Sequence, residues 1–237
     1  MKIFARNGTR TSHLERSFII QRRGMALLAA AFPVIFLVSS FILERTTFQT
    51  SISAYYWTLD PERNIFVGVL CAVGVFLLLY KGYSWFEDRV LDVAGVSAVG
   101  IAFFPMDKLG DCVSSASGVT ASAHGTFAVI FFACIAIICI FMSRNSLKDI
   151  NDPHRRAMFR RAYRWCSGTM IVSIGFAVLY RLLPEEYALF LCEKSIIFWV
   201  EAVGVWAFSA FWYIKTRELD PSLSFIPFRK KSSGLGP

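Results

Sequence analysis

Residues Gly125–Met142 read GTFAVIFFACIAIICIFM, a run of 18 residues without a charged side chain. As a helix that rises 1.5 Å per residue, this run is about 27 Å long, close to the thickness of a membrane's hydrocarbon layer. With 55% hydrophobic residues in 237, the chain carries more apolar surface than one soluble domain can cover. The sequence therefore predicts an all-α, polytopic membrane protein, a bundle of six transmembrane helices at about 24–43, 65–80, 90–104, 125–142, 168–183 and 195–214.

Lys and Arg residues are unevenly divided among the connections between these stretches. The two tails and the even-numbered connections hold 20 of the 25, and the odd-numbered connections, counted with Arg181 at the outer end of the fifth span, hold 5. Because cytoplasmic segments are rich in Lys and Arg, both tails, 1–23 and 215–237, are expected in the cytoplasm, the second of them disordered. The transmembrane domain, 24–214, is expected in the inner membrane of the cell. The same asymmetry explains the net charge of +8, so no nucleic-acid partner is expected.

Three of the predicted spans are shorter than the roughly 20 residues that a crossing needs, so they should continue into polar neighbours such as Asp88 and Arg164. Before the fifth span, Arg156 and Arg160 continue the four-residue spacing of Arg164, which predicts a cytosolic helix with a basic face. Two interpretations remain open. The face rests against anionic lipid head groups, or its charge only sets the topology.

Only two of the six cysteines, Cys112 and Cys192, fall in connections that the topology places outside. A disulfide between them would join the third connection to the start of the last helix, if the outside is oxidising. Two unpaired thiols are the alternative, because topology does not set their separation.

Glu201 is the outstanding polar residue, because it lies inside the last apolar stretch, about 9 Å from its start. Arg181 at the outer end of the fifth span is a candidate counter-charge, and His124 at the outer mouth of the fourth span can act as an acid or base near neutral pH. The first connection adds a polar cluster in which an arginine suits an anionic group. The candidate ligand-binding residues are Ser51, Ser53, Tyr55, Tyr56, Arg63, Asn64, His124, Arg181 and Glu201. Helix packing, a surface turn and interfacial anchoring are the simpler alternatives for these residues.

No motif of known soluble-type chemistry is present. The sequence lacks a phosphate-binding loop, an HExxH pair, a dinucleotide fingerprint and a nucleophile elbow. One external histidine cannot form a multi-histidine zinc site. We therefore assign no catalytic residue, no metal and no cofactor, and the sequence favours a non-enzyme.

Four segments carry a family resemblance: SISAYY at 51–56, ERNIFVGVL at 62–70, YKGY at 80–83 and FWVEA at 198–202. They resemble bacterial multi-pass membrane proteins that are known only as a domain of unknown function. More distantly, residues 45–215 resemble the Frag/DRAM/Sfk group of six-helix membrane proteins. The resemblance implies the helical fold, and the distant group implies a link to lipid organisation and remodelling. Ceramidase-like hydrolases use intramembrane Ser, Asp and several His, and this chain departs from them in having too few helices and one suitable His.

Taken together, these features predict recognition or handling of a lipid or amphiphilic anion through an outward-facing polar pocket. Membrane lipids are the expected partners, and a second copy of the chain, as a homo-oligomer, is a candidate partner. Two alternatives remain. An intramembrane hydrolase acting on a lipid needs a metal or a serine nucleophile, and a small-solute transporter or channel needs polar residues through the whole membrane.

Overall fold

The computed structural model describes residues 2–82, 84–106, 119–147, 150, 152–180 and 182–219. Throughout these residues the secondary structure is helical, and no strand occurs among them, which confirms the all-α prediction. The elements are α1 (Lys2–Phe41), η1 (Ser53–Trp57), α2 (Asp60–Leu79), α3 (Trp85–Phe103), α4 (Val119–Ser146), α5 (Pro153–Tyr180), α6 (Glu185–Glu193) and α7 (Ile196–Leu219).

Five helical segments in the described part of the chain have the length and apolar composition of a membrane crossing. They are Ser17–Phe41, Asp60–Leu79, Ser122–Met142, Pro153–Tyr180 and Ile196–Glu218. Helix α3 is long enough at 19 residues, but four charged side chains lie within its first eight positions, which lowers its hydropathy. The chain is thus a multi-pass α-helical membrane protein, while a sixth crossing through α3 and the placement of the termini stay predictions.

The helices extend further than the apolar runs. As predicted, α3 contains Asp88 and α5 contains Arg164. Helix α1 also runs through the region predicted as an N-terminal tail, from Lys2, and α7 continues past Ile214. A helix satisfies its backbone hydrogen bonds internally, so it does not have to end where the apolar side chains end.

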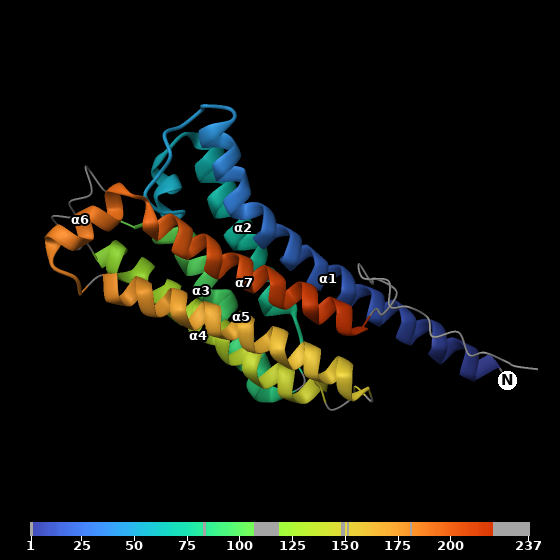
Figure 1. The fold of residues 1–237 in the computed structure, drawn as a ribbon. Helices are drawn as coiled ribbons and strands as arrows, with labels where there is room; N and C mark the ends of the chain where they lie inside the picture. The colour runs from blue at the N-terminus through green and yellow to red at the C-terminus, as the bar shows by residue number, and fades with distance from the viewer. Residues whose placement is uncertain are drawn as a thin grey trace, which may run out of the picture.

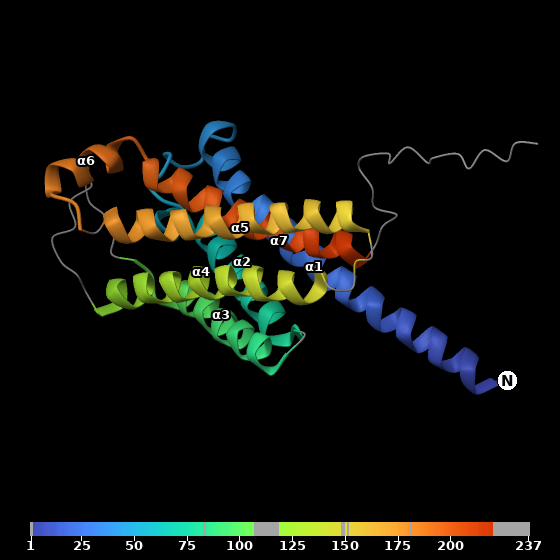
Figure 2. The same cartoon turned by 60° about the horizontal axis from the view of Figure 1, so that its bottom comes forward.

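The six long helices form a closed ring. Among the described residues, consecutive helices pack together from α1 through α5, and α7 packs against both α5 and α1. Figure 1 shows α7 running alongside α1, and Figure 2 shows α5 and α7 above α3 and α4. Helices α2 and α3 approach most closely at a glycine pair, since a Cβ on Gly74 would lie 2.8 Å from the backbone oxygen of Gly95. Small residues at such crossings let helices in a membrane pack closely.

The bundle has two polar ends, which Figure 2 shows at opposite sides. We call residues 42–59, 104–106 and 182–195 the loop end; this end contains α6 and the connection after α1. We call the described residues within 18–23, 80–82, 84–89, 147–165 and 215–219 the basic end; the first part of α1 and the last part of α7 reach it. The described parts of the odd-numbered connections therefore meet at one end of the bundle.

Candidate functional site

Glu201 binds the backbone of the first connection. Its Oε2 accepts a hydrogen bond from the backbone N–H of Ile52 at 2.7 Å and faces the N–H of Ser53. One turn of α7 is held in this way at both its ends, because the N–H of Phe198 also donates to the carbonyl oxygen of Thr50 at 2.9 Å. The first N–H groups of a helix lack partners within it, so a carboxylate at the start of η1 acts as its cap. Glu201 thus fixes the first connection against α7.

His124 joins the same segment to α3. Its Nδ1 lies 2.8 Å from the carbonyl oxygen of Phe104, and its Nε2 lies 3.1 Å from Ser53 Oγ. A carbonyl oxygen only accepts, so Nδ1 carries a proton, and whenever the ring is neutral its Nε2 accepts from the Ser53 hydroxyl. The side chain is buried. The structure therefore brings Ser53, His124 and Glu201 together at the loop end.

Ser51 and Tyr55 complete this junction from inside. Ser51 Oγ accepts from the N–H of Ala54 at 3.0 Å. The Tyr55 ring stacks on Phe36 with centroids 4.3 Å apart, and its hydroxyl lies 2.6 Å from Ser40 Oγ. Burial raises the pKa of Tyr55, so its phenol stays neutral. We call Ser51, Ser53, Tyr55, His124 and Glu201 the loop junction.

The other predicted ligand-binding residues that the structure describes are not part of the loop junction. Tyr56 packs edge-on against Phe66, and Asn64 is exposed. Arg63 forms an ion pair with Asp60 on the surface. Arg181 lies outside the described residues.

The predicted disulfide is described at one of its two cysteines. Cys192 is buried and disulfide-bonded. Cys112 lies outside the described residues, so the pairing of these two cysteines stays a prediction. The four remaining cysteines are free: Cys71, Cys134, Cys139 and Cys166.

A cleft between α1 and α2 opens beside the loop junction. This α1–α2 cleft has a volume of about 240 Å³, and its walls include Ala31, Val34, Ile35, Val38, Arg45 and Glu62. Glu62 is only 3% exposed, and Ser39 Oγ donates to its Oε1. In the described part of the structure, Glu62 Oε2 is buried without a hydrogen-bond partner. A buried acceptor without a partner costs free energy, so this oxygen is a candidate contact for a ligand.

The sequence does contain a signal for Glu62. The buried residues of α2 include Phe66, Val73 and Leu77, which follow Glu62 by 4, 11 and 15 positions. These intervals are close to whole turns of 3.6 residues, so all four lie on one helix face. Arg63 is rotated about 100° from that face. A helical count from the apolar residues would therefore have selected Glu62 rather than Arg63.

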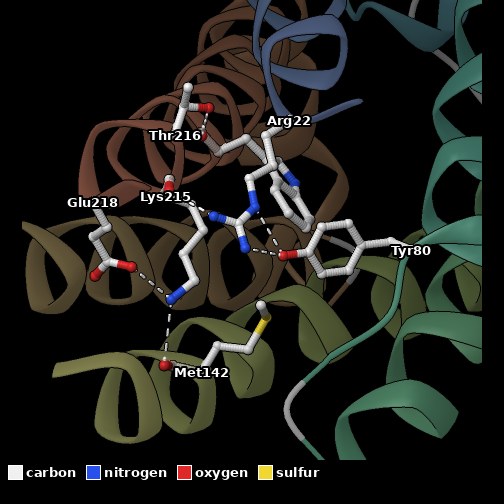
Figure 3. Close-up of polar contacts among 7 residues, drawn as sticks. Arg22, Tyr80, Met142, Lys215, Thr216 and Glu218 are labelled. Carbon is white, nitrogen blue, oxygen red and sulfur yellow. Dashed lines mark hydrogen bonds and ion pairs between the residues drawn. The ribbon is translucent and has the colours of Figure 1, made fainter. Parts of the chain in front are cut away.

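A buried charged cluster occupies the basic end, and sequence reasoning missed it (Figure 3). Arg22 donates from Nε to the Tyr80 hydroxyl at 2.8 Å and from Nη1 to the carbonyl oxygen of Lys215 at 2.8 Å. Lys215 Nζ donates to Glu218 Oε2 at 2.9 Å and to the carbonyl oxygen of Met142 at 3.4 Å. Arg22 is 4% exposed and Lys215 is fully buried. We call Arg22, Tyr80, Met142, Lys215 and Glu218 the basic-end cluster.

This cluster connects four parts of the bundle. Figure 3 shows Arg22 of α1 reaching Tyr80, which follows α2, and the backbone of Lys215 in α7. The Lys215 side chain in turn reaches the backbone oxygen of Met142 in α4. The first predicted span begins at Gly24 and the last one ends at Ile214, so Arg22 and Lys215 lie just outside the predicted spans. Charge at the end of an apolar run is the ordinary sign of the membrane surface, and composition alone does not reveal its burial. Among the described residues, no group of three or more His, Cys, Asp or Glu side chains is placed to hold a metal ion.

Comparison with known families agrees with this membrane architecture. The model of a family described as "Protein of unknown function (DUF998)" matches residues 27–214, which is most of the chain. The protein therefore belongs to this family, whose description assigns no activity. Neither a curated protein nor a solved structure matches the chain. The distant resemblance to the Frag/DRAM/Sfk group stays a prediction.

Proposed function

We propose that this protein recognises a membrane amphiphile in the α1–α2 cleft. The proposal rests on a topology with six crossings and both termini in the cytoplasm, which would place the loop end outside the inner membrane. The observation that carries it is a buried carboxylate oxygen without a described partner, in the wall of a mainly apolar cleft. The ligand class is a lipid whose head group contains both an anionic group and a hydrogen-bond donor.

The apolar part of the cleft suits a hydrocarbon chain. Ala31, Val34 and Val38 line it along one side of α1, and Val34 is 44% exposed. From Ala31 to Ser39 the helix rises about 12 Å. An acyl chain along this wall would cover apolar surface, while its head group would reach Ser39 and Glu62.

The polar end of the cleft carries two complementary charges. The Arg45 guanidinium is exposed and forms no ion pair or hydrogen bond in the described structure, so it is available to a phosphate. The Oε2 atom of the Glu62 carboxylate can accept a further hydrogen bond. Because the last torsion of a glutamate side chain is soft, a small rotation would turn this oxygen toward the cleft. In a head group with an ammonium or hydroxyl group next to a phosphate, the phosphate would bind Arg45 and the donor would bind Glu62.

The loop junction contributes to this function by holding the first connection in place beside the cleft. The connection that it secures carries Leu43 and Arg45 into the wall of the cleft. Glu201 and His124 hold the connection through its residues 52 and 53. We therefore assign Glu201 and His124 as positioning residues, and Glu62 and Arg45 as the ligand contacts.

Native mass spectrometry with two lipids of the same acyl chains tests the proposal. Dioleoyl phosphatidylethanolamine has a phosphate and an ammonium donor, while dioleoyl phosphatidylcholine has the phosphate without the donor. We expect the protein to retain phosphatidylethanolamine about tenfold more strongly, the value of one charge-assisted hydrogen bond. Glu62→Gln should remove this preference.

Two controls make the result decisive. Glu193→Gln changes an exposed glutamate at the same end and should keep the preference. Ala31→Trp fills the apolar end of the cleft without touching Glu62 and should weaken retention of both lipids. Equal retention of the two lipids by the unaltered protein would refute the proposed head-group recognition.

A second candidate function follows from the pairing of Ser53 with His124. Their 3.1 Å contact, with Nδ1 held by a carbonyl, is the arrangement of a nucleophile and its general base. Ser53 Oγ would attack a lipid ester carbonyl as its proton passes to His124 Nε2, and the alcohol would leave with that proton. Water would then cleave the acyl-enzyme. Labelling by a fluorophosphonate, lost in Ser53→Ala and reduced in His124→Gln, would support this hydrolase, and an unlabelled Ser53 would exclude it.

A further inference from the structure

A second cleft lies near the basic end, between α5 and α7, and it shares no residue with the α1–α2 cleft. This α5–α7 cleft has a volume of about 570 Å³. Helix α5 supplies the whole wall except Val203, which belongs to α7.

Two arginines and a tryptophan form the polar mouth of the α5–α7 cleft. Arg161 and Arg164 are exposed, and neither side chain has an ion pair or hydrogen bond to a described residue. Residues three apart lie on one helix face, so both guanidinium groups can reach one phosphate. The indole of Trp165 beside them is 77% exposed, as is typical of a side chain at the membrane surface.

The wall of the cleft beyond the arginines is mainly apolar. Gly168 and Val172 follow Arg164 at steps of four residues, so the three lie on one side of α5 over about 12 Å. A Cβ added to Gly168 would meet no atom within 4 Å, so the cleft is open at this position. Val203 forms the opposite wall from α7. The cleft thus presents positive charge at its mouth and hydrocarbon below.

We propose that the α5–α7 cleft binds one anionic phospholipid from the leaflet at the basic end. Arg161 and Arg164 bind the phosphate, and an acyl chain lies across Gly168 and Val172. Charge complementarity selects an anionic lipid, because two guanidinium groups without described partners meet one head group. The wall beyond the arginines also includes the hydroxyl side chains Thr169 and Ser173, but its apolar share favours a lipid over a soluble anion such as free phosphate. This site uses other residues and a different head-group charge from the α1–α2 cleft, so either proposal can fail without the other.

The test is retention of dioleoyl phosphatidylglycerol against dioleoyl phosphatidylcholine in native mass spectrometry. We expect about 30-fold stronger retention of phosphatidylglycerol, from two basic residues near the head group. The double variant Arg161→Gln/Arg164→Gln should reduce that ratio to near one. The matched control Arg155→Gln/Arg160→Gln removes the same charge from the same helix outside the cleft and should keep the ratio.

A pair of glycine variants tests whether phosphatidylglycerol binds in the cleft or is only attracted by the basic charge of the helix. Gly168→Leu places a side chain in the cleft, whereas Gly175→Leu places one at an equally open position of α5 outside it. Both should fold, because neither Cβ meets a neighbour within 4 Å, and circular dichroism checks this point. Only Gly168→Leu should lower retention of phosphatidylglycerol. Equal losses in the two arginine doubles, or no loss in Gly168→Leu, would overturn the site and leave the arginines a topological role only.

Discussion

The two polar ends of the bundle use their buried groups differently. At the loop end, Glu201 binds a backbone N–H of the first connection, and His124 binds one serine of it and one carbonyl. At the basic end, Arg22 and Lys215 connect parts of four helices through charged side chains and carbonyl oxygens. The loop junction therefore secures one segment, and the basic-end cluster holds helices together.

This difference predicts different kinds of damage. Loss of a contact to one connection permits local opening while the helices stay packed. Loss of one partner from a buried ion pair leaves the other charge poorly compensated and is costly for the whole fold. The following changes test the contrast, beginning with the largest expected effect.

Lys215→Met should strongly destabilise the whole bundle. Lys215 is fully buried, and its loss deprives Glu218 of a close cationic partner. Breaking a buried pair in this way costs about 3–5 kcal/mol, so the midpoint of thermal unfolding in detergent should fall by many degrees. Lys194→Met makes the same substitution at an exposed lysine of the loop end and should have little effect. Similar midpoints for the two variants would show that the basic-end cluster does not hold the helices together.

Glu201→Gln should loosen one segment and leave the rest of the bundle intact. Gln keeps an oxygen that can accept from the Ile52 N–H, but a neutral hydrogen bond contributes about 1 kcal/mol less than one to a charged group, and this contact secures residues 50–57. Hydrogen exchange in nanodiscs should therefore accelerate in these residues, with protection of α2 and α5 unchanged. Glu193→Gln at the exposed end of α6 is the control. Faster exchange spread evenly over all helices would make Glu201 part of the global core instead.

The helices could be predicted from the sequence, and their lateral order could not. Apolar runs such as Gly125–Met142 locate a helix because lipid demands internal hydrogen bonds. Nothing in those runs indicates that α7 closes the ring against α1. That contact depends on side chains such as Ser209, whose Oγ donates to the carbonyl oxygen of Ala26 at 2.7 Å across 183 positions of sequence.

The candidate site was predictable where a charge interrupts an apolar run. Glu201 stands inside such a run, so its burial could be expected, whereas Arg22 and Lys215 stand at the ends of runs and resemble ordinary surface charge. The partner of Glu201 was not predictable, because it is a backbone N–H of the first connection and not a charged side chain. Backbone groups carry no sequence signal.

Arg63→Ala should have the smallest effect. Its ion pair with Asp60 is exposed, and such pairs contribute less than about 1 kcal/mol. We therefore expect the thermal midpoint and the preference for phosphatidylethanolamine to stay within error of the unaltered protein. The adjacent Glu62 points into the bundle, so Glu62→Gln should abolish that preference although the two residues are neighbours in the chain. The reverse result, with Arg63 essential and Glu62 silent, would mean that α2 presents the opposite face to the ligand and that the outer surface of the loop end, not the α1–α2 cleft, is where the amphiphile binds.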